Sequence, residues 1–186
     1  MSRINRRALI QSAAVASLSF SVGGSELLLS PREARAQGAN IRSLKADEVS
    51  ALEAAGEILL PGAREAGIAQ FVDQQVSGSP DDCLLMARIA NVKPPFLNFY
   101  RAALSGLNQA SDRSHGKTFA SLSRDEQHNT IDLLRQAKLE GWAGPPQPFV
   151  YFLLRQDAVD VVYGTVEGFE KLGIPYMPHI LPEQRW

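Results

Sequence analysis

The run FVYFLLRQDAVDVVY, residues 149–163, is apolar on every side for its first turns and keeps apolar positions further along at Val159, Val162 and Tyr163. A surface helix carries a polar face opposite its apolar stripe, so a helix without this polar face near its start belongs inside a helical domain. The loop before it, residues 144–148, holds three prolines and is rigid. We therefore expect residues 149–163 to form the central buried helix.

Helical spacing continues over most of residues 37–186, where apolar residues recur at three- and four-residue steps. The clearest local signal is Ser123-Arg124-Asp125-Glu126, a capping box that opens a helix closed by Gly141. No segment of this part alternates apolar and polar residues over the length of a strand. The sequence therefore predicts an all-α fold, a single domain of about five to six helices. Besides the central helix, the expected helices cover residues 45–60, 63–76, a short piece from 81 or 82 to 92, 96–109 and 124–140, with a polar loop at 111–117.

Length and charge fit one ordinary globular domain after an N-terminal leader. The chain has 186 residues, with 19 Lys and Arg against 20 Asp and Glu, and a formal net charge of −1. Residues 37–186 keep 14 of the basic and 18 of the acidic residues, so their net charge is about −4. A mildly acidic domain without a Lys/Arg run has no electrostatic footprint for nucleic acid or an anionic membrane surface.

The first 36 residues have the three parts of an export signal. Residues 5–11 read NRRALIQ, a charge-free stretch then continues to Ser25, and Ala34-Arg35-Ala36 offers small residues around a cleavage site. The adjacent Arg6 and Arg7, followed by Leu9 and an Ala- and Ser-rich middle, are typical of a twin-arginine signal.

We therefore expect residues 1–36 to be a twin-arginine signal peptide, cleaved after Ala36, and residues 37–186 to be a periplasmic domain. A Sec signal, a mitochondrial transit peptide and an uncleaved membrane anchor are the alternatives. The arginines at the front of the segment disfavour a transit peptide, and the Ser and Gln residues of its middle disfavour a membrane span.

The search for catalytic chemistry in residues 37–186 is largely negative. There is no glycine-rich phosphate loop, no dinucleotide fingerprint, no HExxH, no GxSxG and no haem-attachment motif. The single cysteine, Cys83, precedes an apolar stretch and is expected to be a buried structural thiol. We expect no catalytic, cofactor-binding or metal-binding residue in this chain. The three histidines, His115, His128 and His179, are not paired at ligand spacing.

Two carboxylates leave an alternative open. Asp157 and Asp160 lie three residues apart on the central helix and, with His179, could serve a self-standing periplasmic enzyme or a binding module. We favour a polar flank on a buried helix, since ion pairs perturb carboxylates more often than catalysis does. Asp73 on the second helix is interpreted in the same way.

The C-terminal residues 164–186 are expected to form an extended arm. Three prolines in eight positions oppose a helix, while the apolar residues are too many for a solvated tail. The arm is expected either to fold back over its own helices or to wrap a partner, because Tyr, Met and Trp are enriched at interfaces. The candidate partner-binding residues are Pro175, Tyr176, His179 and Trp186.

Residues 59–73, LLPGAREAGIAQFVD, resemble the "iPGAreAGvaeFiD" stretch of the gluconate 2-dehydrogenase subunit 3 family. The later segments FLLR at 152–155, GT at 164–165 and GIPY at 173–176 resemble the C-terminal pattern of that family. The likeness spans most of residues 37–186 and includes the twin-arginine leader.

The resemblance implies a small, non-catalytic accessory subunit. In that family the large partner is an FAD-dependent oxidoreductase of the glucose-methanol-choline type that oxidises sugar acids, sugars or polyols. It often passes electrons to a multihaem cytochrome c subunit. The large subunit generally lacks an export signal, so the small subunit is expected to stabilise it like a chaperone and escort it through the twin-arginine translocase. FAD is then expected in the partner, haem c in a third subunit, and association with the membrane through the complex.

Overall fold

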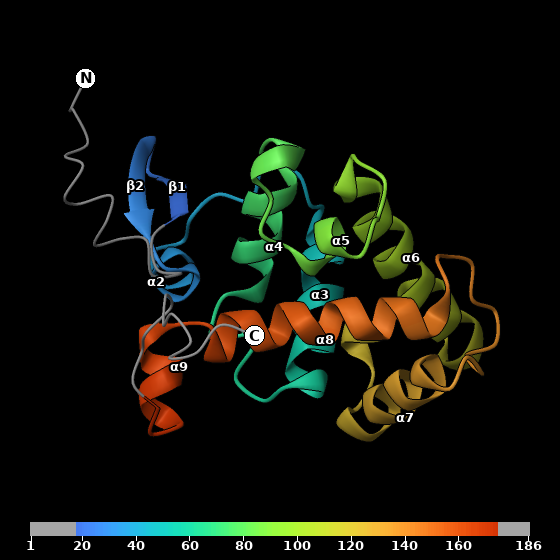
Figure 1. Cartoon of the computed structure of the whole chain (residues 1–186). Helices are drawn as coiled ribbons and strands as arrows, with labels where there is room; N and C mark the ends of the chain where they lie inside the picture. The colour runs from blue at the N-terminus through green and yellow to red at the C-terminus, as the bar shows by residue number, and fades with distance from the viewer. Residues whose placement is uncertain (1–17, 175–186) are drawn as a thin grey trace, which may run out of the picture.

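The computed structural model describes residues 18–174, and helices make up most of its regular structure (Figure 1). The all-α class predicted from the sequence is confirmed, with one small hairpin added. The strands are β1 (Leu18–Val22) and β2 (Ser25–Leu29). The α-helices are α2 (Pro31–Ala36), α3 (Ala46–Leu59), α4 (Ile68–Val76), α5 (Met86–Ile89), α6 (Phe96–His115), α7 (Arg124–Arg135), α8 (Gln147–Tyr163) and α9 (Val166–Lys171). Two 3-10 turns, η1 (Pro80–Asp82) and η2 (Phe119–Ser121), lie between them.

Helix α8 occupies the centre, as its sequence predicts. It runs across the molecule in contact with α3, α4, α5, α7 and α9 (Figure 1). Val150, Leu153 and Leu154 are fully buried, and Val161 near the far end is almost so. The first turns are not enclosed on all sides, because Phe152 is 41% exposed.

Helix α3 confirms the first predicted helix, while α4 begins later than its sequence predicts. Residues 61–67 form turns instead of the first turn of α4. Gly67 has a left-handed backbone, with φ of 84°, which cannot continue into the right-handed helix that it caps. Helix α4 therefore starts at Ile68.

Helix α6 is longer than expected. It continues to His115 through residues expected to be a polar loop, and ends where Gly116 adopts φ of 66°. Its last turn is tied down because the Arg113 guanidinium donates a hydrogen bond of 2.9 Å to the Gly141 carbonyl oxygen. Gly141 follows a turn rather than closing α7, which ends at Arg135.

The capping box at the start of α7 is present as predicted. The Ser123 backbone N–H donates to the Glu126 carboxylate over 2.8 Å, and the Glu126 N–H donates to the Ser123 hydroxyl oxygen. Hydrogen bonding to the Ser123 backbone and hydroxyl lowers the pKa of Glu126. This helix is therefore stabilised by its own local sequence.

The short helix expected from Asp81 or Asp82 is split in two. Ser79, not an aspartate, caps η1 by accepting a hydrogen bond from the Asp81 N–H, and α5 follows only at Met86. Cys83 lies between them and is buried, as predicted. Burial raises the pKa of the Cys83 thiol, which makes it unreactive at neutral pH.

Asp73 joins α4 to the segment before α3. Its carboxylate accepts hydrogen bonds from the backbone N–H groups of Arg42, Ser43 and Leu44 at 2.7–2.8 Å. The side chain is almost fully buried. Asp73 therefore has a structural role, but it is buried instead of forming the polar flank expected from the sequence.

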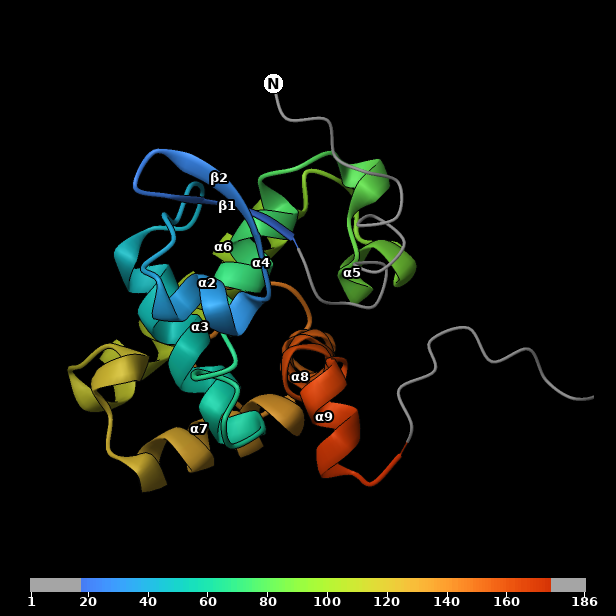
Figure 2. The ribbon, with the colours of Figure 1, turned by 90° about the vertical axis from the view of Figure 1, so that its left-hand side faces the viewer.

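Residues 18–36 form a folded unit that the sequence did not predict. Strands β1 and β2 pair antiparallel from Leu18↔Leu29 to Val22↔Ser25 around a Gly23-Gly24 turn. Helix α2 follows at once, and Figure 2 shows the hairpin and α2 lying over α4. The stretch up to Ser25 is charge-free and suits an export signal, and the short strands alternate too weakly to stand out.

The start of the predicted C-terminal arm is helical. Thr165 caps α9 by accepting a hydrogen bond from the Gly168 N–H at 3.1 Å, and the helix ends before the first proline of the arm at Pro175. The prolines oppose a helix only beyond that point, which lies outside the described residues. Among residues 18–174, no helix has the length and apolar character needed to cross a membrane.

Candidate partner-binding site

Asp157 on α8 is a buried carboxyl group with one partner. It is 0% exposed, and one of its oxygens accepts a hydrogen bond of 2.7 Å from the Tyr100 hydroxyl of α6. The other oxygen, Oδ1, has no hydrogen-bond partner among the described residues. Burial raises the pKa of Asp157 to about 8, against the smaller lowering effect of the Tyr100 hydrogen bond. The group is therefore largely protonated at neutral pH.

Asp160, one turn further along α8, is half-buried, and burial raises its pKa. The two carboxyl groups thus differ, because Asp157 is enclosed by the core and only Asp160 reaches the surface. The third member of the suggested site, His179, lies outside the described residues. Within residues 18–174 no group of three or more His, Cys, Asp or Glu side chains is placed to hold a metal ion.

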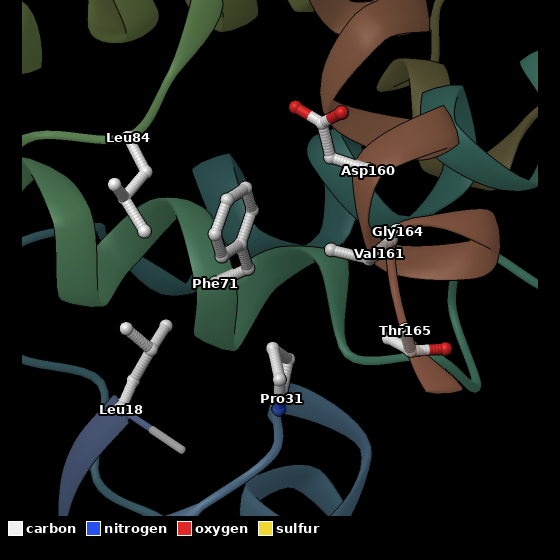
Figure 3. A pocket seen from close by; sticks show the side chains of 8 residues that line it. All are labelled: Leu18, Pro31, Phe71, Leu84, Asp160, Val161, Gly164 and Thr165. Carbon is white, nitrogen blue, oxygen red and sulfur yellow. The ribbon is translucent and has the colours of Figure 1, made fainter. Parts of the chain in front are cut away.

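An apolar groove opens beside Asp160. Its volume is about 250 Å³, and its walls come from the hairpin, α2, α4, the η1–α5 segment and the end of α8. Figure 3 shows the Phe71 ring of α4 in the middle, with Leu84 above it, Leu18 and Pro31 below it, and the Asp160 carboxylate at the rim. The remaining lining residues are Val161, Gly164 and Thr165.

The chemistry of this groove suits the binding of apolar side chains better than catalysis. Leu84 is 57% exposed on its wall although it is apolar, and the rim offers one carboxyl group of raised pKa. Among the described residues that line the groove, Asp160 is the one titratable side chain and Thr165 offers the one hydroxyl. An apolar groove with an exposed leucine on its wall is a candidate for a surface that another protein covers.

A protein-family model, Gluconate 2-dehydrogenase subunit 3, matches residues 46–180. The chain belongs to this family. No curated protein and no solved structure matches the chain. Membership makes the chain an accessory subunit of a larger dehydrogenase complex.

The subunit 3 domain has further exposed apolar side chains outside the groove. Ile89 at the end of α5 is 72% exposed, and Leu172 and Ile174 after α9 are also exposed. The family match covers α4, the η1–α5 segment and the end of α8 with Gly164 and Thr165, which build most of the groove. Leu18 and Pro31, on the other side, lie before the matched residues.

The residues predicted to carry function lie partly outside the described chain. Arg6, Arg7 and Leu9 of the export signal fall there, as do the partner-binding candidates of the arm: Pro175, Tyr176, His179 and Trp186. Ala34 and Ala36, which precede the predicted cleavage site, both lie in α2. Ala34 is 0% exposed and Ala36 is exposed.

Sequence reasoning missed the groove itself. Phe71 lies in the helix expected over residues 63–76 and belongs to the main core, but its ring also lines the groove. Leu84 follows Asp81-Asp82-Cys83 in a segment too short to show a face. The available signal is the consecutive Leu84-Leu85-Met86, of which Leu85 is fully buried and Leu84 is exposed on the groove wall.

Proposed function

We propose that this chain is the non-catalytic small subunit of an FAD-dependent dehydrogenase of the glucose-methanol-choline type that oxidises a sugar acid, a sugar or a polyol. The observation that carries the proposal is the family match over residues 46–180. FAD belongs in the large subunit under this proposal, and haem c in a third, cytochrome subunit. The fully buried Asp157 agrees with a structural role, because it cannot touch a substrate.

The groove is the proposed contact with the large subunit. Phe71, Leu84 and Val161 offer it an apolar surface, so the occupant is expected to be an apolar segment of the flavoprotein. Binding would remove water from the half-buried Asp160 carboxyl. A hydrogen-bond donor of the partner is therefore expected to face this group. The arm residues Tyr176 and Trp186 would add to this contact.

The leader supplies the proposed escort. Arg6 and Arg7 match the twin-arginine pattern. This chain has no cofactor motif of its own, so a cofactor in the partner would explain why the pair is exported in the folded state. The periplasm is the proposed location of the complex, which would meet the membrane through its other subunits.

Replacing both Arg6 and Arg7 with Lys tests the escort. Ammonium groups do not replace guanidinium groups in recognition, so the variant should leave the flavoprotein in the cytoplasm. The measurement is dehydrogenase activity, with an artificial electron acceptor, in periplasmic and cytoplasmic fractions. Normal activity in the periplasm would contradict the escort.

A Leu84→Glu variant tests the groove as the contact. A charge on its wall should weaken binding of the large subunit by at least about tenfold in a titration of the purified chains. Leu28→Glu, on exposed β2 away from the groove lining, is the matched control and should bind normally. Deleting residues 173–186 should weaken binding of the large subunit by a larger fraction than it lowers the helix content of this chain. Equal affinities for Leu84→Glu and Leu28→Glu would remove the groove from the interface.

A further inference from the structure

Residues 18–36, together with Ala39 just after them, carry a small core. Phe20, Leu29, Ala34 and Ala39 form a buried cluster separate from the main core, which runs from Leu44 to Val161. The main core takes none of its buried members from residues before 37, although Leu18 packs against it from the edge. The hairpin and α2 can therefore leave the domain without removing a buried member of its main core, although Phe71, which lines the groove with Leu18 and Pro31, loses cover.

The unit is nevertheless attached closely to α4 and α3. The Pro31 carbonyl oxygen lies where a side chain of Gly67 would be, 2.1 Å from the ideal Cβ position. Arg32 forms an ion pair of 2.5 Å with Glu65, and Arg35 forms one with Glu53. Figure 2 shows this close stacking of α2 and the hairpin on α4.

The predicted cleavage site lies inside this folded unit. Ala34 and Ala36 are helical, and Ala34 is fully buried in the small core. The Ser30–Glu33 capping box holds the start of α2, and the Asn40 N–H beyond it donates to the Ser21 carbonyl oxygen at 2.9 Å. Proteolysis requires an exposed chain that can leave its folded conformation, so the bond after Ala36 is protected in this state.

The length of the leader also requires the hairpin to unfold. With the hairpin folded, residues 8–17 are all that stands between the arginine pair and β1. A backbone inside the hydrocarbon core must be helical to satisfy its polar groups, and ten helical residues reach about 15 Å against a core of about 30 Å. The leader can span the membrane only if β1 and β2 unfold.

From these contacts we infer that residues 18–36 are a removable cap over α4. The closed cap withholds the bond after Ala36 from the peptidase and covers one side of the groove through Leu18 and Pro31. Its opening frees the cleavage site, lengthens the leader and uncovers Phe71 in one event. The role of the cleavage site rests on the proposed export function, whereas the existence of the cap does not.

Limited trypsin digestion of the purified full chain, without any partner, tests the cap. Cuts after Arg32 and Arg35 in α2 are timed by mass spectrometry of the peptides. Phe20→Ser removes the aromatic ring from the small core and should increase the population of the open cap. Because the rate of cutting follows this population, both cuts should be faster by at least about tenfold. Leu28→Ser, an exposed position of the same hairpin, is the matched control and should stay within about twofold of the unchanged chain.

A purified signal peptidase in detergent micelles should likewise cut the bond after Ala36 faster in Phe20→Ser than in Leu28→Ser or the unchanged chain. Equal cutting of the unchanged chain and Phe20→Ser at Arg32 and Arg35 would overturn the cap. Hydrogen exchange on the unchanged chain needs no variant, and it should show slow exchange at the Ala39 and Asn40 amides, which donate to Ala34 and Ser21. Exchange there at free-chain rates would also overturn it. Since no partner or export step is involved, failure of the escort leaves these outcomes unchanged.

Discussion

Asp157 makes the stability of the domain depend on pH. Its carboxyl has a pKa of about 8 when folded, against an ordinary value of 3.8, so the folded chain holds a proton that the unfolded chain has lost. The free energy of unfolding should therefore fall as pH rises between about 4 and 8, and should level off above pH of about 8. Asp157→Asn cannot lose a proton and should flatten this slope, leaving the smaller contribution of Asp160.

The measurement is the midpoint of thermal unfolding at pH 5, 6.5 and 8. The unchanged chain should lose about 5 °C or more over this range, and Asp157→Asn should lose less than half as much. Asp112→Asn, at an exposed position on α6, is the control and should follow the unchanged chain. Parallel slopes for Asp157→Asn and the unchanged chain would mean that Asp157 is ionised in the folded state.

Asp73 is the second residue with a measurable structural role. Asp73→Ala leaves the N–H groups of Arg42, Ser43 and Leu44 without their acceptor, and should lower the free energy of unfolding by about 3 kcal/mol. Urea unfolding gives the value, with Asp112→Ala as the exposed counterpart. A loss below about 1 kcal/mol would show that water replaces the carboxylate.

Between elements, Gly67 sets how closely α2 approaches α4. Gly67 and Gly38 both have positive φ, but only at Gly67 would a Cβ meet another backbone. Gly67→Ala should therefore displace α2 and speed trypsin cutting after Arg32, whereas Gly38→Ala should show the backbone strain alone. If the two variants are cut at similar rates, the contact with Pro31 does not hold the cap.

Elements with signals in their own sequence could be predicted. The capping box at Ser123 starts α7, and the apolar run of α8 places that helix at the centre. Boundaries set by distant contacts could not, since α6 continues to His115 with help from the Arg113–Gly141 hydrogen bond. The hairpin was missed because its largely apolar sequence, with Glu26 as the one charged residue, also fits an export signal.

Across the whole molecule, the family was easier to predict than the site. Family resemblance rests on a continuous run, residues 59–73, and the match over 46–180 confirms it. The groove instead joins residues from Leu18 to Thr165, and the burial of Asp157 depends on Tyr100, 57 positions away. Such placements follow from packing, which no local pattern in the sequence encodes.

The central claim is that this chain is the accessory subunit of a flavin dehydrogenase. The direct measurement is affinity purification of the tagged chain from the periplasm of its own cells, followed by the absorbance spectrum, subunit masses and dehydrogenase activity of the product. The account predicts a yellow complex in which a larger, FAD-containing subunit oxidises a sugar acid, sugar or polyol. A colourless chain recovered alone, with catalytic activity of its own, would contradict it.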